Sequence, residues 1–210
     1  MKESISRDHR GFAADAATRA PAAQAKRAWR ERLRAMRACL ARDPDAVAQL
    51  NQRLARWLGE QDARCLAFYW PMQDEPDLRT TIAAWLAHDT RRRAALPVID
   101  DARGPLAFHR WTPDAPMRAG RYGIAVPATA EPLTPTLLLI PCVGFDACGY
   151  RLGYGGGFYD RTLAAAAPRP RTLGIAFDGC RVAALPHEAH DLPLDRILTE
   201  AGVFDTPPSK

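Results

Sequence analysis

The sequence predicts an α/β protein whose largely parallel sheet is covered by helices on both faces. Apolar segments of strand length alternate along the chain with amphipathic segments of helical period, the order that parallel strands joined by helices produce. The segment Thr136–Ile140 (TLLLI) is the most convincing buried strand. A glycine-rich loop follows it, and α/β sheets commonly bind ligands at the carboxyl ends of their strands. The fold class therefore already indicates where a site should lie.

Two helices are predicted before the first strand. From Lys26 onward, apolar residues recur at helical spacing and basic residues form a stripe about a quarter turn away. The apolar positions are Trp29, Leu33, Met36 and Leu40, and the basic ones are Lys26, Arg30, Arg34 and Arg37. The basic stripe should therefore border the buried face. Asp43 and Pro44 precede a second amphipathic helix, which Gly59 closes.

The remaining elements alternate between strand and helix. Arg64–Trp70 (RCLAFYW) is apolar at both alternations, as in a strand covered on both faces, and Pro71 ends it. A polar loop, Met72–Asp77 (MQDEPD), follows at the carboxyl end of that strand. Further along the chain we expect a helix at 78–86, strands at 94–99 and 106–111, a helix at 160–167 and a strand at 172–177.

Composition limits the classes of protein to which the chain can belong. Of its 210 residues, 47% are apolar and 25% are charged, which is ordinary for a globular chain and unlike a disordered or coiled-coil sequence. The longest strongly apolar run, Leu137–Ile140, is far shorter than the ~20 residues of a membrane-spanning helix, so we expect a soluble protein without a membrane partner. The formal net charge of +5 suits an anionic partner but does not identify it.

Cysteine usage and the N-terminal residues bear on location and domain organisation. The five cysteines are scattered and never in C-x-x-C spacing, so neither a disulfide framework nor a zinc site is indicated, and a reducing cytoplasm fits best. Residues 1–24 lack the apolar centre of a secretory signal and contain acidic residues that transit peptides avoid. We therefore expect a flexible extension over residues 1–24 and a single domain over residues 25–205.

The segment Pro141–Arg161 (PCVGFDACGYRLGYGGGFYDR) carries the clearest chemical signal. It is rich in glycine, and Gly153, Gly155 and Gly157 occupy every second position. Glycine lets the backbone approach a ligand closely, so successive N–H groups can converge on phosphate oxygens beside the start of a helix. Arg151 would add a cation at the entrance of the loop. A phosphate-binding loop is therefore favoured over the alternative, a flexible surface turn.

This loop matches neither of the two common nucleotide motifs. Phe158 stands at the third glycine position of G-x-G-x-x-G, and no Gly-Lys-Ser/Thr follows as in a P-loop. Instead, RLGYGGGFYDR preceded by PCVGFD resembles the R-x-G-x-G-x-G-[YF]-Y-D signature of the 5-formyltetrahydrofolate cyclo-ligase family, also called 5,10-methenyltetrahydrofolate synthetases. Supporting matches, within a resemblance from Lys26 to Val203, are K-x-x-x-R from Lys26, MQDE from Met72 and the tail LPHEAHDLPLDRILTE.

The resemblance implies a Rossmann-like three-layer α/β/α sandwich and a reaction that depends on ATP and Mg²⁺. In that reaction 5-formyltetrahydrofolate is cyclised to 5,10-methenyltetrahydrofolate, with release of ADP and phosphate. Phosphorylation of the formyl oxygen would turn it into a leaving group, and N10 of the substrate would then attack. Because the nucleophile belongs to the substrate, no catalytic nucleophile is expected in the protein, which would contribute positioning and charge stabilisation.

The resemblance also assigns roles to individual residues. ATP would be bound by Lys26, Arg30, Arg151, Leu152, Gly153, Tyr154, Gly155, Gly156, Gly157, Phe158 and Tyr159, with Arg151 and Tyr159 as candidate positioning residues. The folate would be contacted by Trp70, Glu75 and Tyr154, and Arg30 is a further candidate contact. Magnesium would be bound by Asp160, with Asp191 or Asp195 as a second ligand.

Each of these assignments has a plain structural alternative. The alternatives are a helix cap for Asp160, a solvated basic face for Lys26 and Arg30, an exposed loop acid for Glu75, core packing for Trp70, and a structural segment instead of a zinc site for His187, His190 and Asp191. Phe158 stands where the family often has tyrosine, so any hydroxyl role at that position is absent from this chain.

Two rival functions fit the sequence less well than the family resemblance does. An RNA-binding module using the basic helix would be expected to carry an RNP signature or a KH-type loop, which the sequence lacks. An enzyme of similar fold acting on a phosphorylated sugar or nucleotide would have no reason for MQDE and K-x-x-x-R. We therefore expect a monomer with ATP and 5-formyltetrahydrofolate as partners and no nucleic acid; a preference for polyglutamylated folates is left open.

Overall fold

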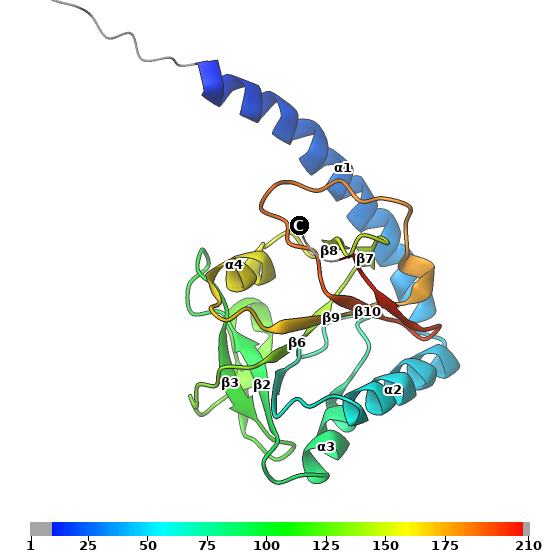
Figure 1. Cartoon of the computed structure of the whole chain (residues 1–210), viewed down its shortest axis with the longest axis vertical. Helices are drawn as coiled ribbons and strands as arrows, with labels where there is room; N and C mark the ends of the chain where they lie inside the picture. The colour runs from blue at the N-terminus through cyan, green and yellow to red at the C-terminus, as the bar shows by residue number, and fades with distance from the viewer. Residues whose placement is uncertain (1–9, 208–210) are drawn as a thin grey trace, which may run out of the picture.

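A seven-stranded, mostly parallel sheet forms the middle layer of the structure (Figure 1). The computed structural model describes residues 10–207, with side chains described from residue 23 onward. In spatial order the strands are β11 (Val203–Asp205), β10 (Arg196–Leu198), β9 (Arg171–Ile175), β6 (Leu137–Pro141), β1 (Cys65–Ala67), β2 (Arg93–Val98) and β3 (Ala107–Trp111). Neighbouring strands from β10 to β2 run parallel, and only the edge strands β11 and β3 are antiparallel to their neighbours. The predicted largely parallel sheet is confirmed.

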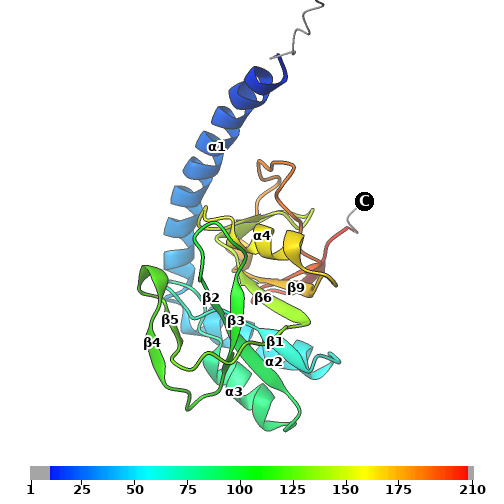
Figure 2. The same ribbon diagram turned by 90° about the vertical axis from the view of Figure 1, so that its left-hand side faces the viewer.

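Helices cover both faces of this sheet. Within the described residues they are α1 (Arg10–Leu40), α2 (Pro44–Gly59), α3 (Arg79–Ala87) and α4 (Phe158–Ala165). Figures 1 and 2 show α2 and α3 on one side of the strands and α4 on the other. Successive residues of β6 follow the same division, because Leu139 belongs to the core beneath α1, α2 and α3 whereas Leu138 belongs to the core that contains Leu163 of α4. The predicted three-layer sandwich is therefore also confirmed.

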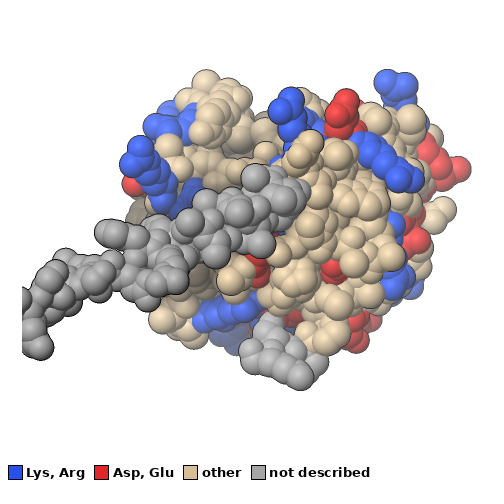
Figure 3. All heavy atoms as spheres, turned by 90° about the horizontal axis from the view of Figure 1, so that it is seen from above, with Lys and Arg blue, Asp and Glu red and all other residues tan. Residues whose placement is uncertain are grey.

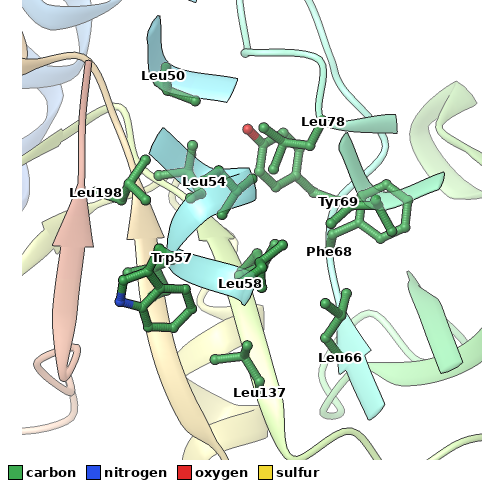
Figure 4. Packing of buried hydrophobic residues seen from close by; sticks show 14 of the residues in the cluster. Leu50, Leu54, Trp57, Leu58, Leu66, Phe68, Tyr69, Leu78, Leu137 and Leu198 are labelled. Carbon is green, nitrogen blue, oxygen red and sulfur yellow. The ribbon is translucent and has the colours of Figure 1, made fainter. Parts of the chain in front are cut away.

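Helix α2 shows how the sequence directs one of these layers. Leu54 and Leu58 are completely buried and lie close to Leu66 of β1 (Figure 4). Burial of each such leucine contributes about 1.5–3 kcal/mol. The Asp43 carboxylate accepts hydrogen bonds from the backbone N–H groups of Asp45 (3.0 Å) and Ala46 (3.4 Å), so the helix begins where the sequence predicted.

The limits of several elements differ from the predicted ones. The first strand is only Cys65–Ala67, shorter than predicted, because the chain leaves the sheet before Pro71. The Phe68 N–H still donates a hydrogen bond to the Ala95 carbonyl (3.0 Å). Helix α1 begins at Arg10, well before Lys26. Residues 1–9 of the expected flexible extension lie outside the described residues and residues 10–24 belong to α1, so the extension and the domain limits stay predictions. Within residues 10–207, no helix is both long and apolar enough to span a bilayer.

Short strand pairs that periodicity did not reveal complete the fold. They are β4 (Met117–Ala119) with β5 (Ala125–Pro127), and β7 (Gly144–Phe145) with β8 (Arg151–Leu152), both antiparallel. The first pair brackets a tight turn, η1 (Arg121–Gly123), and the second leads directly into the glycine-rich loop. Both pairs lie beside the edge of the sheet at which β1 and β6 end, and it is there that the predicted site residues gather.

Candidate functional site

A cavity of about 1110 Å³ lies at the carboxyl ends of β1 and β6. Two other hollows near β10 and β11 are about half as large, at about 530 and 510 Å³. The large cavity is lined by α1, the loop after β1, the β4–β5 hairpin, the glycine-rich loop with the first turn of α4, and the loop that contains Asp191. In the sheet β1 lies between β2, which follows it in the chain, and β6, which comes later, so the strand order reverses at β1. Such a point, at the carboxyl ends of the strands, is where α/β sheets usually bind ligands.

All predicted site residues except Asp195 lie around this one cavity. They are Lys26, Arg30, Trp70, Glu75, Arg151, Leu152, Gly153, Tyr154, Gly155, Gly156, Gly157, Phe158, Tyr159, Asp160 and Asp191. Asp195, the alternative second metal ligand, lies outside it, and its carboxylate accepts hydrogen bonds from the N–H and hydroxyl groups of Thr172. Their roles stay predictions, but the structure brings segments from the whole length of the chain to one place.

The glycine-rich loop has a backbone that its glycines make possible. Gly155 and Gly157 have φ angles of +95° and +64°, a region that other residues rarely adopt. Gly157 is the N-cap residue of α4, so the loop runs directly into the start of a helix, where N–H groups are left without intrahelical partners. Asp160 lies one turn later and is not the cap. This geometry suits an anionic ligand such as a phosphate chain.

Two basic side chains of α1 reach toward this loop. The Arg30 Nε donates a 2.9 Å hydrogen bond to the Gly153 carbonyl, which leaves its terminal nitrogens without a hydrogen-bonding partner among the described residues. The Lys26 Nζ lies 2.6 Å from Asp191 and 3.1 Å from Glu188. Burial lowers the pKa of Lys26, but the hydrogen bonds to Asp191 and Glu188, together with the negative charges of these carboxylates, outweigh that effect and raise the pKa above its ordinary value. Neither side chain belongs to a merely solvated face.

Asp160 and Asp191 offer the oxygen ligands that magnesium prefers. Asp160 Oδ1 lies 3.0 Å from an Arg151 nitrogen and accepts a hydrogen bond from the Leu192 N–H, while Asp191 Oδ2 is held by Lys26. The other oxygen of each carboxylate accepts no hydrogen bond within the described part of the chain. No three His, Cys, Asp or Glu side chains are grouped there to hold a metal by themselves. This donor set fits Mg²⁺, which binds through one or two carboxylates together with phosphate oxygens and water.

Glu75 is buried, so the exposed-acid alternative is wrong. Its Oε2 accepts a 2.8 Å hydrogen bond from the Met72 N–H, and its Oε1 accepts one of 2.8 Å from the Tyr154 hydroxyl. Burial raises the pKa of Glu75 above its ordinary value, against the opposing effect of these hydrogen bonds and of the nearby Arg37. The loop is fixed further by the Tyr69 hydroxyl, which donates to the Pro76 carbonyl (3.0 Å).

Aromatic side chains form part of the cavity wall. Trp70 lines the cavity and also packs against the core, so both of its predicted roles have a basis in the structure, and the Arg79 guanidinium lies over its ring at 4.6 Å. Burial raises the pKa of Tyr154 and of Tyr159 far above the ordinary value, with the negative charge of Glu75 as a further cause. Both phenols therefore stay protonated at neutral pH and can act as hydrogen-bond donors.

The structure adds to the site residues that were not among its predicted members. Arg37, predicted to border the buried face, is itself buried against Tyr154 and Glu75. Arg34, next to it in the stripe, donates from Nη2 to the Gln73 side chain (3.0 Å). Tyr122 lines the cavity from the β4–β5 hairpin, whose strands are too short to show periodicity. Of these residues, only Arg34 and Arg37 could have been found from the sequence, because the basic stripe to which they belong identifies the face of α1 that borders the site.

The surface and the C-terminal histidines bear on the competing readings. On the face shown in Figure 3, Lys and Arg atoms are interspersed with Asp and Glu atoms and with other residues. This pattern does not favour a nucleic-acid interface, which would present a concentrated basic field. His187 stacks on the ring of Tyr150 at 3.8 Å, and His190 is exposed beside Glu188 and Asp191. These contacts are compatible with the interpretation of the segment that contains His187, His190 and Asp191 as a structural one.

Comparisons with known proteins agree with the geometry of the cavity. Residues 22–200 match the model of the 5-formyltetrahydrofolate cyclo-ligase family. The chain is 32% identical over 161 residues to the 5-formyltetrahydrofolate cyclo-ligase of Haemophilus influenzae, covering 73% of this chain and 84% of the relative. It is 30% identical over 168 residues to that of Mycolicibacterium smegmatis, covering 74% and 85%.

Two solved structures are also similar. The 5,10-methenyltetrahydrofolate synthetase of Aquifex aeolicus superposes with a TM-score of 0.72 at 25% identity, covering 88% of this chain and 94% of that one. The corresponding structure from Mycoplasma pneumoniae superposes with a TM-score of 0.67, covering 83% and 98%, and at 24% identity it bears on the fold alone.

Proposed function

Because the chain belongs to the 5-formyltetrahydrofolate cyclo-ligase family, we propose that it converts 5-formyltetrahydrofolate and ATP into 5,10-methenyltetrahydrofolate, ADP and phosphate. The observation that carries this proposal is the placement of two loops on one cavity. The glycine-rich loop suits a phosphate chain, and the loop after β1 presents a buried carboxylate suited to the N–H donors of a reduced pterin ring. The two substrates would thus meet between neighbouring strands.

The proposed chemistry explains why the cavity contains no activated nucleophile among its described residues. The formyl group is an amide, and its oxygen is a poor leaving group. Transfer of the γ-phosphoryl group of ATP to that oxygen forms a phosphate ester and releases ADP. N10 of the folate then attacks the formyl carbon and loses its proton, and the C–O bond breaks to release phosphate. The protein needs only to align the reactants and stabilise charge.

The residues of the cavity divide this task. The N–H groups of the glycine-rich loop and the free nitrogens of Arg30 would bind the phosphate chain, while Lys26 would add a second cation. Glu75 would orient the pterin ring, with Trp70 and Tyr154 beside it. Arg151, paired with Asp160, and Tyr159 would position the reacting groups. Asp160 and Asp191 would hold Mg²⁺, which when bound neutralises phosphate charge.

Location and assembly complete the proposal. We place the enzyme in the cytoplasm as a monomer that acts on small molecules and not on nucleic acid. All five cysteine thiols are unpaired, which is compatible with a reducing compartment. Size-exclusion chromatography with light scattering would test the monomer directly, and a mass of twice 23.1 kDa would contradict it.

The decisive experiment is to follow the strongly absorbing methenyl product. Purified protein should form it from 5-formyltetrahydrofolate only when ATP and Mg²⁺ are both present, with one ADP released per product. ATP hydrolysis should also require the folate, because the phosphoryl acceptor is the formyl oxygen and not water. Product formation without ATP, or rapid ATP hydrolysis without folate, would contradict the proposal.

A further inference from the structure

Arg37 is a buried cation to which the proposed reaction gives no role. Its side chain is only 2% exposed, and it does not line the cavity but lies behind the wall that Tyr154 and Glu75 form. Its Nη2 donates a 2.7 Å hydrogen bond to the Tyr154 hydroxyl, while its Nε and Nη1 have no hydrogen-bond partner among the described residues. Burying a guanidinium with two unpartnered donors costs free energy, so compensation must come from its charged surroundings.

That compensation comes through a short chain of hydrogen bonds. The Tyr154 hydroxyl accepts from Arg37 and donates to Glu75 Oε1 at 2.8 Å, and Arg37 Nη1 lies 3.9 Å from the same oxygen. An arginine can only donate and an ionised carboxylate can only accept, so the single proton of the hydroxyl must point toward Glu75. With the Met72 N–H on Oε2, both oxygens of Glu75 are held.

The three residues belong to three different segments. Arg37 lies on α1, Glu75 lies in the loop after β1, and Tyr154 lies in the glycine-rich loop. We propose that Arg37 is a positioning residue, which fixes the Glu75 carboxylate for the folate by holding the Tyr154 hydroxyl between them. This proposal rests on the proposed function only in assigning the folate to Glu75. The link among the three side chains is independent of it.

A purely structural role would be served better by an apolar side chain. Leu33, one turn before Arg37 on the same helix, is buried in the core, so this face of the helix packs against apolar side chains. Replacing a buried ion pair by apolar residues of similar volume is often neutral or stabilising. A cation buried there is therefore best explained by a requirement for charge next to Glu75.

The effect of the Arg37 charge can be measured through the pKa of Glu75. Five ionisable groups of the described chain face Glu75 from α1, from the segments that follow β1 and β6, from the glycine-rich loop and from α4: Arg37, Tyr69, Cys142, Tyr154 and Tyr159. Burial raises the pKa of Cys142 to about 12 and raises the pKa of the three phenols, so these groups are neutral at pH 7. Arg37 is thus the charged group that lowers the pKa of Glu75 against the effect of burial.

The test uses Arg37→Met, Arg37→Lys and Tyr154→Phe, with Arg32→Met as the matched control on an exposed position of the same helix. Arg37→Met should raise the KM for 5-formyltetrahydrofolate roughly 10-fold with a smaller change in kcat, the loss expected for a hydrogen bond to a charged group. It should also move the acid limb of the kcat/KM profile for folate upward by about one pH unit. Arg37→Lys should restore the acid limb, and Arg32→Met should change neither quantity.

Titration of Glu75 in the ligand-free protein separates this inference from the proposed function. Followed by ¹³C NMR of the labelled carboxyl, the pKa of Glu75 should rise in Arg37→Met and in Tyr154→Phe and stay unchanged in Arg32→Met. An unchanged pKa in both variants would overturn the proposal, whatever the activity. If Arg37→Met does not fold, Tyr154→Phe decides, because it removes a single oxygen. Failure of the wild-type protein to form the methenyl product would contradict the proposed function and leave this titration valid.

Discussion

Lys26 on α1 and Asp191 in the loop before β10 form a 2.6 Å ion pair across 165 positions of the sequence. The pair joins α1, near the start of the described chain, to a loop near its C-terminal end, and both residues line the cavity. Burial raises the pKa of Asp191, but the hydrogen bonds from Lys26 and from the Glu188 N–H, together with nearby positive charge, outweigh that effect and lower the pKa below its ordinary value. The contact places one cation and one carboxylate where the phosphate chain and its metal are proposed to bind.

Removing this cation should weaken ATP binding. Lys26→Met should reduce the affinity for a nonhydrolysable ATP analogue about 10-fold and leave binding of 5-formyltetrahydrofolate nearly unchanged. The loss should grow as the ionic strength falls, because salt screens Coulomb attraction between the lysine and a polyanion. Isothermal titration calorimetry at two salt concentrations measures this, with the exposed Arg27→Met as control. An equal loss for both ligands would indicate a displaced helix instead.

The glycines of the loop should differ in their tolerance of a side chain. Gly155→Ala and Gly157→Ala force a Cβ onto positive φ, and at Gly157 it would also lie 2.8 Å from the Arg161 side chain. Each should reduce the affinity for the ATP analogue by about 10-fold or more, since backbone strain of this kind costs about 1–3 kcal/mol. Gly153→Ala is the matched control, because its Cβ would enter open space. Equal binding by all three variants would contradict the phosphate-loop assignment.

The metal assignment predicts a change in the magnesium titration. Asp160→Asn replaces a charged oxygen ligand by a neutral amide, a much weaker ligand for a hard cation. Turnover at fixed ATP should then require about 10-fold more Mg²⁺ for half-saturation. The control is Asp205→Asn, whose carboxylate pairs with Arg196 far from the cavity. If the Asp160→Asn titration superposes on that of the wild type, Asp160 is not a ligand.

Glu75 should control folate affinity in a pH-dependent way. Glu75→Gln keeps the shape but loses the charge, so 5-formyltetrahydrofolate should bind roughly 10-fold to 150-fold more weakly while the ATP analogue is unaffected. Since burial raises the pKa of Glu75 above 4.5, the carboxylate is protonated as the pH falls through that raised value. The kcat/KM for folate should therefore decline on the acid side above pH 4.5 in the wild type and lose this limb in Glu75→Gln.

Asp146 should contribute more to stability than any surface ion pair. Its buried carboxylate accepts hydrogen bonds from the N–H groups of Cys148, Tyr150 and Leu185, which joins the β7–β8 hairpin to the C-terminal loop. Asp146→Ala leaves these donors unpartnered and should lower the free energy of unfolding by about 3 kcal/mol or more, measured by urea denaturation. Asp205→Asn should cost less than about 1 kcal/mol. A small loss in Asp146→Ala would mean that water replaces the carboxylate.

Much of the fold could be predicted because its core elements carry local signals. The leucines of α2 repeat at helical spacing, and the apolar run of β6 is long enough to identify a strand buried on both faces. The last two strands along the chain, β10 and β11, were not predicted. At three residues each, they are too short for alternation to show, and they depend on hydrogen bonds to neighbours already in the sheet.

The site was predictable where a motif is contiguous and not where contacts join distant segments. The loop from Arg151 to Asp160 stands out by its own composition. Arg37 could be placed at the border of a helix face, but its burial depends on Tyr154, 117 positions away. Nothing near Arg37 in the sequence specifies that partner. The same holds for Glu75, which reads as a loop acid until Tyr154, 79 positions later, covers it.

The direct pairing of β1 with β6 has a consequence for how this enzyme can change over time. The segments that lead to the two substrate loops leave strands held in register by backbone hydrogen bonds, with Leu66 opposite Leu137 and Ala67 opposite Leu138. Adjacent strands of a sheet lie about 4.8 Å apart, and replacing side chains in the cavity leaves this spacing unchanged. Residues lining the cavity can be exchanged to retune affinity for either substrate while donor and acceptor keep their alignment. Divergent binding preferences and a common reaction are thus compatible within one scaffold.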